Sequence, residues 1–192
     1  MKHLIKKSTI ISFLGAVLCI SFSFGQAFKL DATKSTLKVF GTSSLHDWHI
    51  ITDSFSGSMS FASLEEGKLD KLHVDILSET LKSGKKSMDK NTYKALKTDK
   101  YPKIAFHLTQ VNEVKSLGGN TYALETYGDL VISGTKRNIP LRLKVQIKGN
   151  TVTLIGEKSI KMTDFNIEPP TALFGTITTG DDLTIKFETI FR

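Results

Sequence analysis

Cysteine and catalytic signatures are scarce in this sequence. Its 192 residues include one cysteine, Cys19, so a disulfide bond within the chain is excluded and the fold must hold by packing alone. No Gly-x-Ser-x-Gly motif, phosphate-binding glycine loop or dinucleotide fingerprint occurs. No internal repeat, and no linker rich in proline, glycine and serine, divides the chain. These absences favour a single folded domain that is not an enzyme and needs no cofactor.

The first 27 residues have the layout of a signal peptide. A basic start with three lysines is followed by an uncharged, mostly apolar run from Ser8 to Phe24. The small residues after it predict cleavage after Ala27 or Gly25, and therefore a periplasmic or secreted protein. A retained membrane anchor is the alternative, although about 17 residues is short for a bilayer span. Lipidation at Cys19 is disfavoured because Leu18, and not a small residue, precedes it.

The charge of the remaining chain narrows the choice of partner. Three of the 26 basic residues lie in the predicted signal peptide, which leaves 23 basic and 19 acidic side chains, a net charge of +4. This mild excess is compatible with anionic ligands or an anionic membrane surface. Nucleic acid is not an expected partner of an exported protein.

Alternation of apolar and polar residues with period two dominates from Phe28 onward. In Asn138–Lys148 every second residue is apolar, and in Phe55–Phe61 the intervening residues are all serine. This period is typical of half-buried strands, and glycine-rich turns such as Gly118-Gly119-Asn120 separate the segments. Eight or nine such strands predict an all-β fold, with an antiparallel sheet closed on itself or folded into a sandwich.

One segment, Ser87–Thr98, has helical spacing. Its apolar or small residues Met88, Thr92, Ala95 and Leu96 fall near one face. Ser87 is the predicted N-cap, and Pro102 closes the segment a few residues later. We therefore expect one short helix inserted between strands.

A cluster of lysines surrounds the predicted helix and makes the local field strongly positive. One interpretation is a solvated helix; the other is a basic rim beside a barrel mouth, which meets membrane phosphates or a lipid head group. The cluster comprises Lys82, Lys85, Lys86, Lys90, Lys94, Lys97, Lys100 and Lys103.

The stretch GTSSLHDWHI, residues 41–50, contains two histidines, an aspartate and the only tryptophan. On one strand, His46 and Trp48 share a face, while Asp47 and His49 share the other. The histidines then diverge, with no third histidine or cysteine at ligand spacing, so neither a metal site nor a catalytic relay is expected. We interpret the stretch as the end of an early strand.

Several segments, in order, resemble the YceI-like family. They are GTSSLHDW (residues 41–48), DKYPKIAF (99–106), GDLVISGTKRNIPL (128–141) and the closing IKMTDFNIEPP (160–170) with TGDDLTIKFE (179–188). The resemblance spans residues 28–192. It implies a lipocalin-like antiparallel β-barrel in which a polyisoprenoid or similar amphiphile lies in an apolar channel. The chain departs from the family at residues 39–43, where many relatives carry the histidine of an F-x-V-x-H pattern.

The hypothesis from the sequence is an exported protein that holds a polyisoprenoid or similar lipid in a barrel of about eight strands. A solid-cored barrel that docks a partner through the lysine-rich helix is the alternative, and a metal-dependent enzyme using His46 and His49 is a further one. Exposed strand edges also permit a homodimer. The predicted ligand-binding residues are Val39, His46, Trp48, Phe55, Met59, Phe61, Val74, Ile76, Phe106, Leu108, Leu130, Leu143, Val145, Ile185 and Phe187, with Lys90 and Lys94 at a charged head group.

Overall fold

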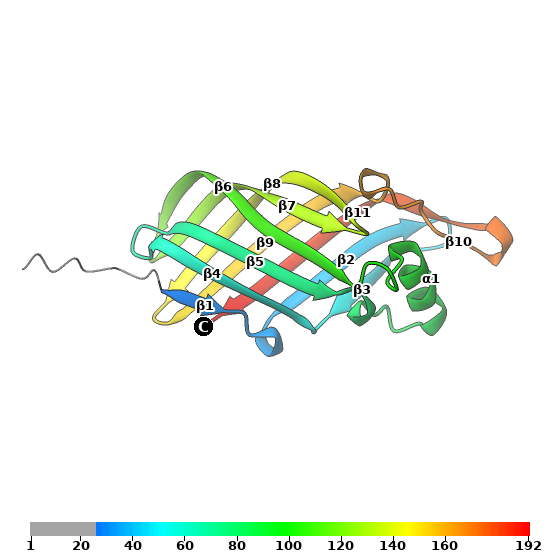
Figure 1. The fold of residues 1–192 in the computed structure, drawn as a ribbon, viewed down its shortest axis with the longest axis horizontal. Coiled ribbons are helices and arrows are strands. Elements are labelled where there is room, and N and C mark those ends of the chain that lie inside the picture. The colour runs from blue at the N-terminus through cyan, green and yellow to red at the C-terminus, as the bar shows by residue number, and fades with distance from the viewer. Residues whose placement is uncertain (1–25) are drawn as a thin grey trace, which may run out of the picture.

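The computed structural model describes residues 26–192, which form one long, curled antiparallel sheet with a single α-helix at one end (Figure 1). Residues 1–25 of the predicted signal peptide, Cys19 included, lie outside the described residues. The strands are β1 (Ala27–Lys29), β2 (Thr36–Ser43), β3 (Trp48–Thr52), β4 (Phe55–Ser63), β5 (Lys68–Leu77), β6 (Lys103–Gly118), β7 (Thr121–Ile132), β8 (Thr135–Lys148), β9 (Thr151–Lys161), β10 (Thr171–Ala172) and β11 (Ile177–Phe191).

The predicted all-β fold is confirmed, but the sheet has 11 strands in place of eight or nine. The difference lies in β1, β3 and β10, which have three, five and two residues. β1 and β10 do not hold enough residues to display a period of two, and β3 begins within the stretch interpreted as the end of one strand. Short 3₁₀ helices lie at Ala32–Lys34, Ser78–Thr80, Thr163–Phe165 and Leu173–Gly175.

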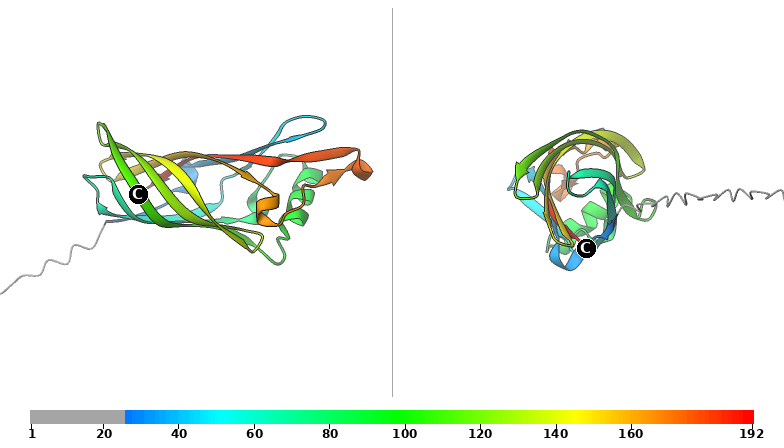
Figure 2. Two further views of the ribbon diagram at one scale, coloured as in Figure 1. Left: turned by 90° about the horizontal axis from the view of Figure 1, so that it is seen from above. Right: turned by 90° about the vertical axis from the view of Figure 1, so that its left-hand side faces the viewer.

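The sheet follows the order β1-β4-β5-β6-β7-β8-β9-β11-β2-β3, with β10 paired to β11. Backbone hydrogen bonds tie each edge strand to another part of the chain, β1 to the residue after β11 and β3 to the segment between β5 and α1. At one end, Lys29 and Arg192 exchange N–H···O bonds of 2.7 and 2.8 Å; at the other, Ile51 and Lys82 exchange bonds of 2.9 and 2.8 Å. Viewed along the long axis, the strands therefore form a ring (Figure 2).

One end of this barrel is packed solid. The hairpins β4–β5, β6–β7 and β8–β9 converge there with β1 and the end of β11 (Figure 1). Phe28, Val145, Val152 and Phe191 are at most 1% exposed, and the rings of Phe28 and Phe61 meet edge to face with centroids 6.0 Å apart. Interior side chains of β1, β4, β5, β7, β8, β9 and β11 thus pack into one buried cluster at this end.

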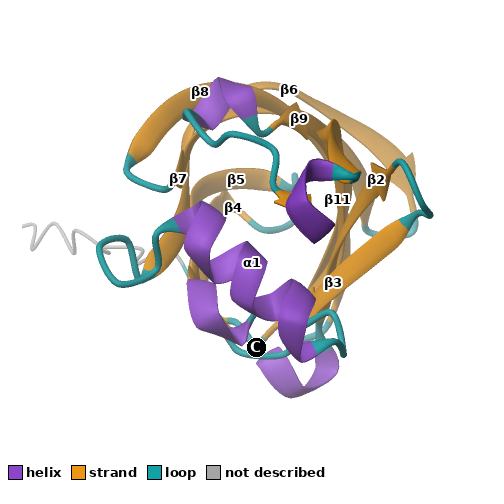
Figure 3. Ribbon diagram, turned by 90° about the vertical axis from the view of Figure 1, so that its right-hand side faces the viewer, coloured by secondary structure: helices purple, strands orange, loops and turns teal. Residues whose placement is uncertain are grey.

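The helix α1 (Lys86–Leu96) lies across the other end of the barrel (Figure 3). The predicted N-cap was wrong: Lys85 occupies that position, and Ser87 lies within the first turn. The helix begins earlier because the Asp89 carboxylate accepts hydrogen bonds from the Ser83 backbone N–H (2.7 Å) and hydroxyl (2.6 Å). It ends at Lys97, whose left-handed backbone (φ 53°) stops it.

In residues 26–192, no helix has the length and apolar character needed to span a bilayer.

We expect Phe191→Ala to lower the free energy of unfolding by about 3–5 kcal/mol, because the lost ring leaves a void in the solid end. Urea denaturation followed by circular dichroism measures this change. Leu117→Ala is the matched control: Leu117 is 52% exposed, and its truncation should change the free energy by less than about 0.5 kcal/mol. Equal effects of the two substitutions would contradict the assignment of the solid end.

Candidate functional site

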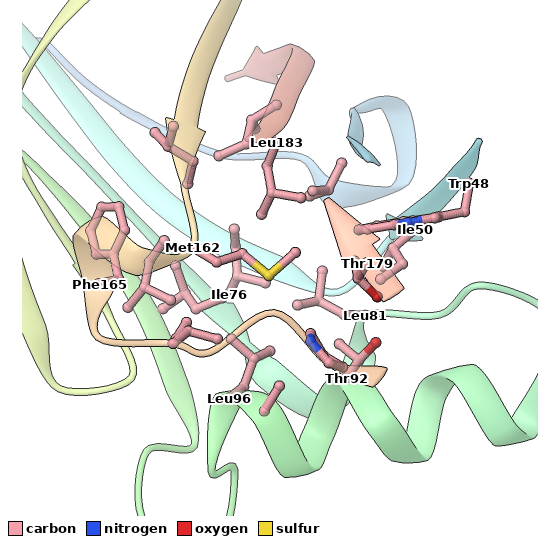
Figure 4. A pocket seen from close by; sticks show the side chains of 18 of the residues that line it. Trp48, Ile50, Ile76, Leu81, Thr92, Leu96, Met162, Phe165, Thr179 and Leu183 are labelled. Carbon is pink, nitrogen blue, oxygen red and sulfur yellow. The ribbon is translucent and has the colours of Figure 1, made fainter. Parts of the chain in front are cut away.

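An apolar cavity of about 940 Å³ occupies the barrel end opposite the solid core. Its floor is formed by Leu72, Leu143 and Leu154, which also belong to the solid core. Side chains from several strands and from the loop after β9 point into it, among them Ile76 and Met162 (Figure 4). The volume is that of a typical small-molecule site. The interior is therefore not filled along its whole length, which contradicts the solid-cored alternative.

Two glycines keep large rings against the wall of the cavity. A Cβ on Gly128 would lie 2.2 Å from a ring carbon of Phe106, and a Cβ on Gly156 would lie 2.4 Å from a ring carbon of Phe187. Each ring therefore occupies the place that a side chain would take on the neighbouring strand. Because these rings lie along the wall, they line the cavity and leave its centre open.

The cavity reaches the surface at a mouth formed by Leu45, His46, Lys85, Asn91 and Phe174. All five residues line the cavity and are exposed to solvent. Leu45 is 67% exposed, and Phe174 is fully exposed. They come from the β2–β3 loop, the N-cap and the middle of α1, and the loop before β11, which lie at the same end of the molecule (Figure 3).

The stretch GTSSLHDW is a hairpin, which corrects its interpretation as the end of one strand. β2 ends at Ser43 and β3 begins at Trp48. The turn forms because the Ser43 hydroxyl donates to the His46 carbonyl (2.7 Å) and accepts from the His46 N–H (3.2 Å). Gly41 pairs with Trp48, whose ring covers it and whose Nε1 donates to the Thr42 carbonyl (2.9 Å).

The two histidines of this hairpin lie on different sides of it. His46 lines the cavity mouth, and its Nδ1 is 2.8 Å from the Asp47 carbonyl. His49 is exposed and lies beside the Phe40 ring, with centroids 6.1 Å apart. Within residues 26–192, no group of three or more histidine, cysteine, aspartate or glutamate side chains is placed to hold a metal ion.

One face of α1 forms part of the cavity wall. Met88, Thr92, Ala95 and Leu96, which share a face by helical spacing, all line it, together with Asn91. The sequence identified this face but did not show what it covers. The reason is that the helix lies far along the chain from most of the strands it meets.

Hydrogen bonds hold α1 in place over the barrel. The Tyr93 hydroxyl lies 2.8 Å from the Glu79 carbonyl and accepts a hydrogen bond from Lys82, which raises the pKa of Lys82 above its ordinary value. At the end of the helix, the Ser133 hydroxyl donates to the Leu96 carbonyl (2.9 Å). The helix is thereby joined to the segment before it and to the β7–β8 turn.

The loop after β9 contributes another part of the wall through Met162, Phe165 and Ile167. The Asp181 carboxylate fixes its 3₁₀ turn by accepting hydrogen bonds from the Thr163 hydroxyl (2.7 Å) and N–H (2.9 Å). These bonds lower the pKa of Asp181 below its usual value. Sequence reasoning missed this wall because the loop has neither strand nor helical periodicity.

Most of the predicted ligand-binding residues line the cavity: Val39, His46, Trp48, Val74, Ile76, Phe106, Leu130, Leu143, Ile185 and Phe187. The others do not. Phe55, Met59, Phe61, Leu108 and Val145 lie in or against tightly packed clusters. Alternation gives the face of a strand and not the position along the axis, so these inward residues were placed in a channel that does not extend to them. Lys90 and Lys94 are exposed on α1, away from the cavity face.

Lys158 is the cationic residue of the lining that sequence reasoning missed, whereas Lys85, which also lines the cavity, belongs to the lysine cluster predicted as a basic rim. The signal for Lys158 was available: it shares the strand phase of Val152, Leu154 and Ile160, which are all buried. A lysine on the apolar phase of a strand is an exception that strand alternation alone can reveal.

Comparison with protein families gives a match to the YceI-like domain over residues 28–191. The chain belongs to the YceI-like family. The family model spans the barrel from β1 to the last residue of β11, so it includes both the solid end and the cavity. A search of curated proteins found no match.

Solved structures share the fold of this YceI-like chain. Burkholderia cenocepacia BcnA is 21% identical with a TM-score of 0.68, over 84% of this chain and 98% of that one. A polyisoprenoid-binding domain from Saccharophagus degradans, implicated in plant cell wall breakdown, is 15% identical with a TM-score of 0.69, over 86% and 97%. The Campylobacter jejuni YceI protein is 19% identical with a TM-score of 0.58, over 71% and 80%.

We expect Gly41→Val to displace the Trp48 ring, because a Cβ at position 41 would lie 2.2 Å from Trp48 Cζ2. The substitution should cost about 1–3 kcal/mol of stability and change the emission of Trp48, the only tryptophan. Urea unfolding of a double-mutant cycle with Trp48→Ala tests the contact. The cost of Gly41→Val should largely vanish in the Trp48→Ala background, and an undiminished cost would refute the packing.

Proposed function

We propose that this protein is an exported binding protein that holds a polyisoprenoid or another long-chain amphiphile in its cavity. The observation that carries the proposal is the shape and lining of the cavity: an apolar floor, largely apolar walls and a mouth to solvent. The polyisoprenoid-binding domain among the similar folds supports the ligand class. The basic, apolar start of the sequence supports export to the periplasm or beyond.

Burial supplies the driving force for binding. Each methylene group removed from water contributes about 0.8 kcal/mol, so an isoprenoid or acyl chain gains several kcal/mol before any polar contact. A void of this size also leaves lining atoms without neighbours, and a bound chain restores those contacts. Binding and not catalysis is the activity that this site supports.

We expect Val39→Trp to reduce the lipid that co-purifies with the protein, because Val39 lines the cavity at mid-height of β2 and the larger ring would fill it. Organic extraction of the purified protein followed by mass spectrometry measures bound lipid. Lys38→Trp is the matched control, since Lys38 is the exposed neighbour on the other face of the same strand. Full lipid content in folded Val39→Trp would overturn the proposed function.

We also propose that the mouth receives its ligand at an anionic membrane surface. Leu45 and Phe174 expose apolar side chains there, and α1, which lies across the same end of the barrel, exposes lysines, among them Lys90 and Lys94. Apolar tips flanked by cations suit a surface of negative head groups over a hydrocarbon layer. This arrangement gives Lys90 and Lys94 a role outside the cavity.

The double substitution Lys90→Gln/Lys94→Gln should weaken binding to phosphatidylglycerol vesicles about thirtyfold, since each lysine near such a surface contributes about 1 kcal/mol. Co-sedimentation at several salt concentrations measures the binding. Lys115→Gln/Lys144→Gln removes the same charge from exposed positions near the solid end and should have little effect. Equal losses in both double variants would show that net charge, and not the mouth, is responsible.

A further inference from the structure

The most unusual feature of the cavity is a lysine on its wall. Lys158 lies on β9 in the same phase as the buried residues Leu154 and Ile160. It pairs directly with Ile185 of β11, which also lines the cavity. Residues directly opposite in an antiparallel pair share one face of the sheet. The Lys158 side chain therefore belongs to the interior face, although lysine is among the residues least often buried.

The charges on the cavity lining are all basic. Among the described residues that line it are two lysines, Lys85 and Lys158, and no aspartate or glutamate is present. The ammonium groups thus act on the interior without a carboxylate to neutralise them. In an apolar enclosure a charge acts over a longer range than in water, so the site favours an anion.

Two carboxylates on β9 and β11 near Lys158 in the strand register are paired with other lysines. Glu157, on the outer face of β9, contacts Lys186 at 3.1 Å, and Asp182 contacts Lys161 at 2.8 Å. In the described part of the chain, Lys158 itself has neither an ion pair nor a side-chain hydrogen bond. Lys158 is half-buried, and placing a lysine without a charged partner on an apolar wall is costly; an anionic ligand group would remove that cost.

The position of Lys158 along β9 places this charge deep in the cavity. Two residues before Lys158, Gly156 pairs with Leu143, a floor residue. The ring of Phe187 packs against Gly156. Lys158 is therefore the next inward residue above the floor. Lys85, in contrast, is exposed at the mouth, where water solvates its charge and weakens any ion pair.

We propose that the cavity selects long-chain amphiphiles with an anionic head, a carboxylate or a phosphate monoester, and that Lys158 binds this head near the floor. The chain then extends along the apolar wall of β2, α1 and the loop after β9 toward the mouth. This inference rests on the proposed function, since it specifies which amphiphile the same cavity takes. It reverses the orientation expected from the sequence, in which exposed lysines at the rim meet the head group.

Three probes with one chain and different heads test the proposal: oleate, oleyl alcohol and oleylamine. Their binding to the delipidated full-length protein is measured by the fluorescence of Trp48, which lines the cavity. We expect oleate to bind about tenfold more tightly than oleyl alcohol, because a hydrogen bond to a charged group contributes about 1.5–3 kcal/mol. Lys158→Gln should reduce this preference to less than about twofold.

Two matched variants separate the deep lysine from other positive charges. Lys85→Gln removes the charge at the mouth, and Lys144→Gln removes one from the outer face of β8; both should keep the preference for oleate. Lys158→Glu should reverse it in favour of oleylamine. Lys158→Met, which suits an apolar wall, replaces Lys158→Gln if the latter does not fold, as judged by its circular dichroism spectrum.

The outcomes distinguish this inference from the proposed function. If no probe binds the wild-type protein, the proposed function itself fails. If all three bind equally well, or if Lys158→Gln and Lys158→Met keep the preference for oleate, the cavity takes a chain but Lys158 is not its head-group site. Loss of the preference in Lys85→Gln alone would place the head at the mouth and overturn the proposed orientation.

Discussion

The uneven distribution of aromatic rings along the barrel axis is the constraint on which the cavity depends. At the solid end, Phe28, Phe61 and Phe191 fill the space between opposite walls. At the other end, Phe106 and Phe187 lie along the wall, against glycines of neighbouring strands. The same residue type thus closes the barrel in one half and lines an open space in the other. The difference is made by what each ring meets on the adjacent strand.

This division assigns stability and binding to different halves of one sheet. The solid end contains the largest cluster of buried side chains, and it carries the closure between β1 and β11. The open end forgoes part of its packing, because the atoms around a void lack neighbours on one side. A ligand with a flexible apolar chain supplies those neighbours. The long strands connect the halves, so the closed end holds the open one in shape.

The helix α1, which borders the mouth, is held in place by hydrogen bonds more than by burial of its side chains. Among its described residues, α1 buries none fully, and Tyr93 and Ser133 fasten it to the rest of the molecule. Elements with few buried contacts open at lower free-energy cost than core strands. The helix is therefore the part of the wall best suited to move aside for a ligand that is longer than the cavity is wide. The lysines on its outer face leave the apolar inner face undisturbed.

The sequence by itself determined the all-β class, the inserted helix with its apolar face, the resemblance to the YceI-like family and the inward face of most strands. These follow from local periodicity and from short motifs, both of which are properties of neighbouring residues. The tertiary structure decided how far along the axis each inward side chain lies. Val145 of β8 and Val39 of β2 both belong to the inward face, yet Val145 is in the solid core and Val39 lines the cavity. It also decided that residues 41–48 form a hairpin and that the inward face bearing Lys158 borders a cavity. These features depend on register and on ring–glycine contacts between strands distant in the chain, which a period of two cannot encode.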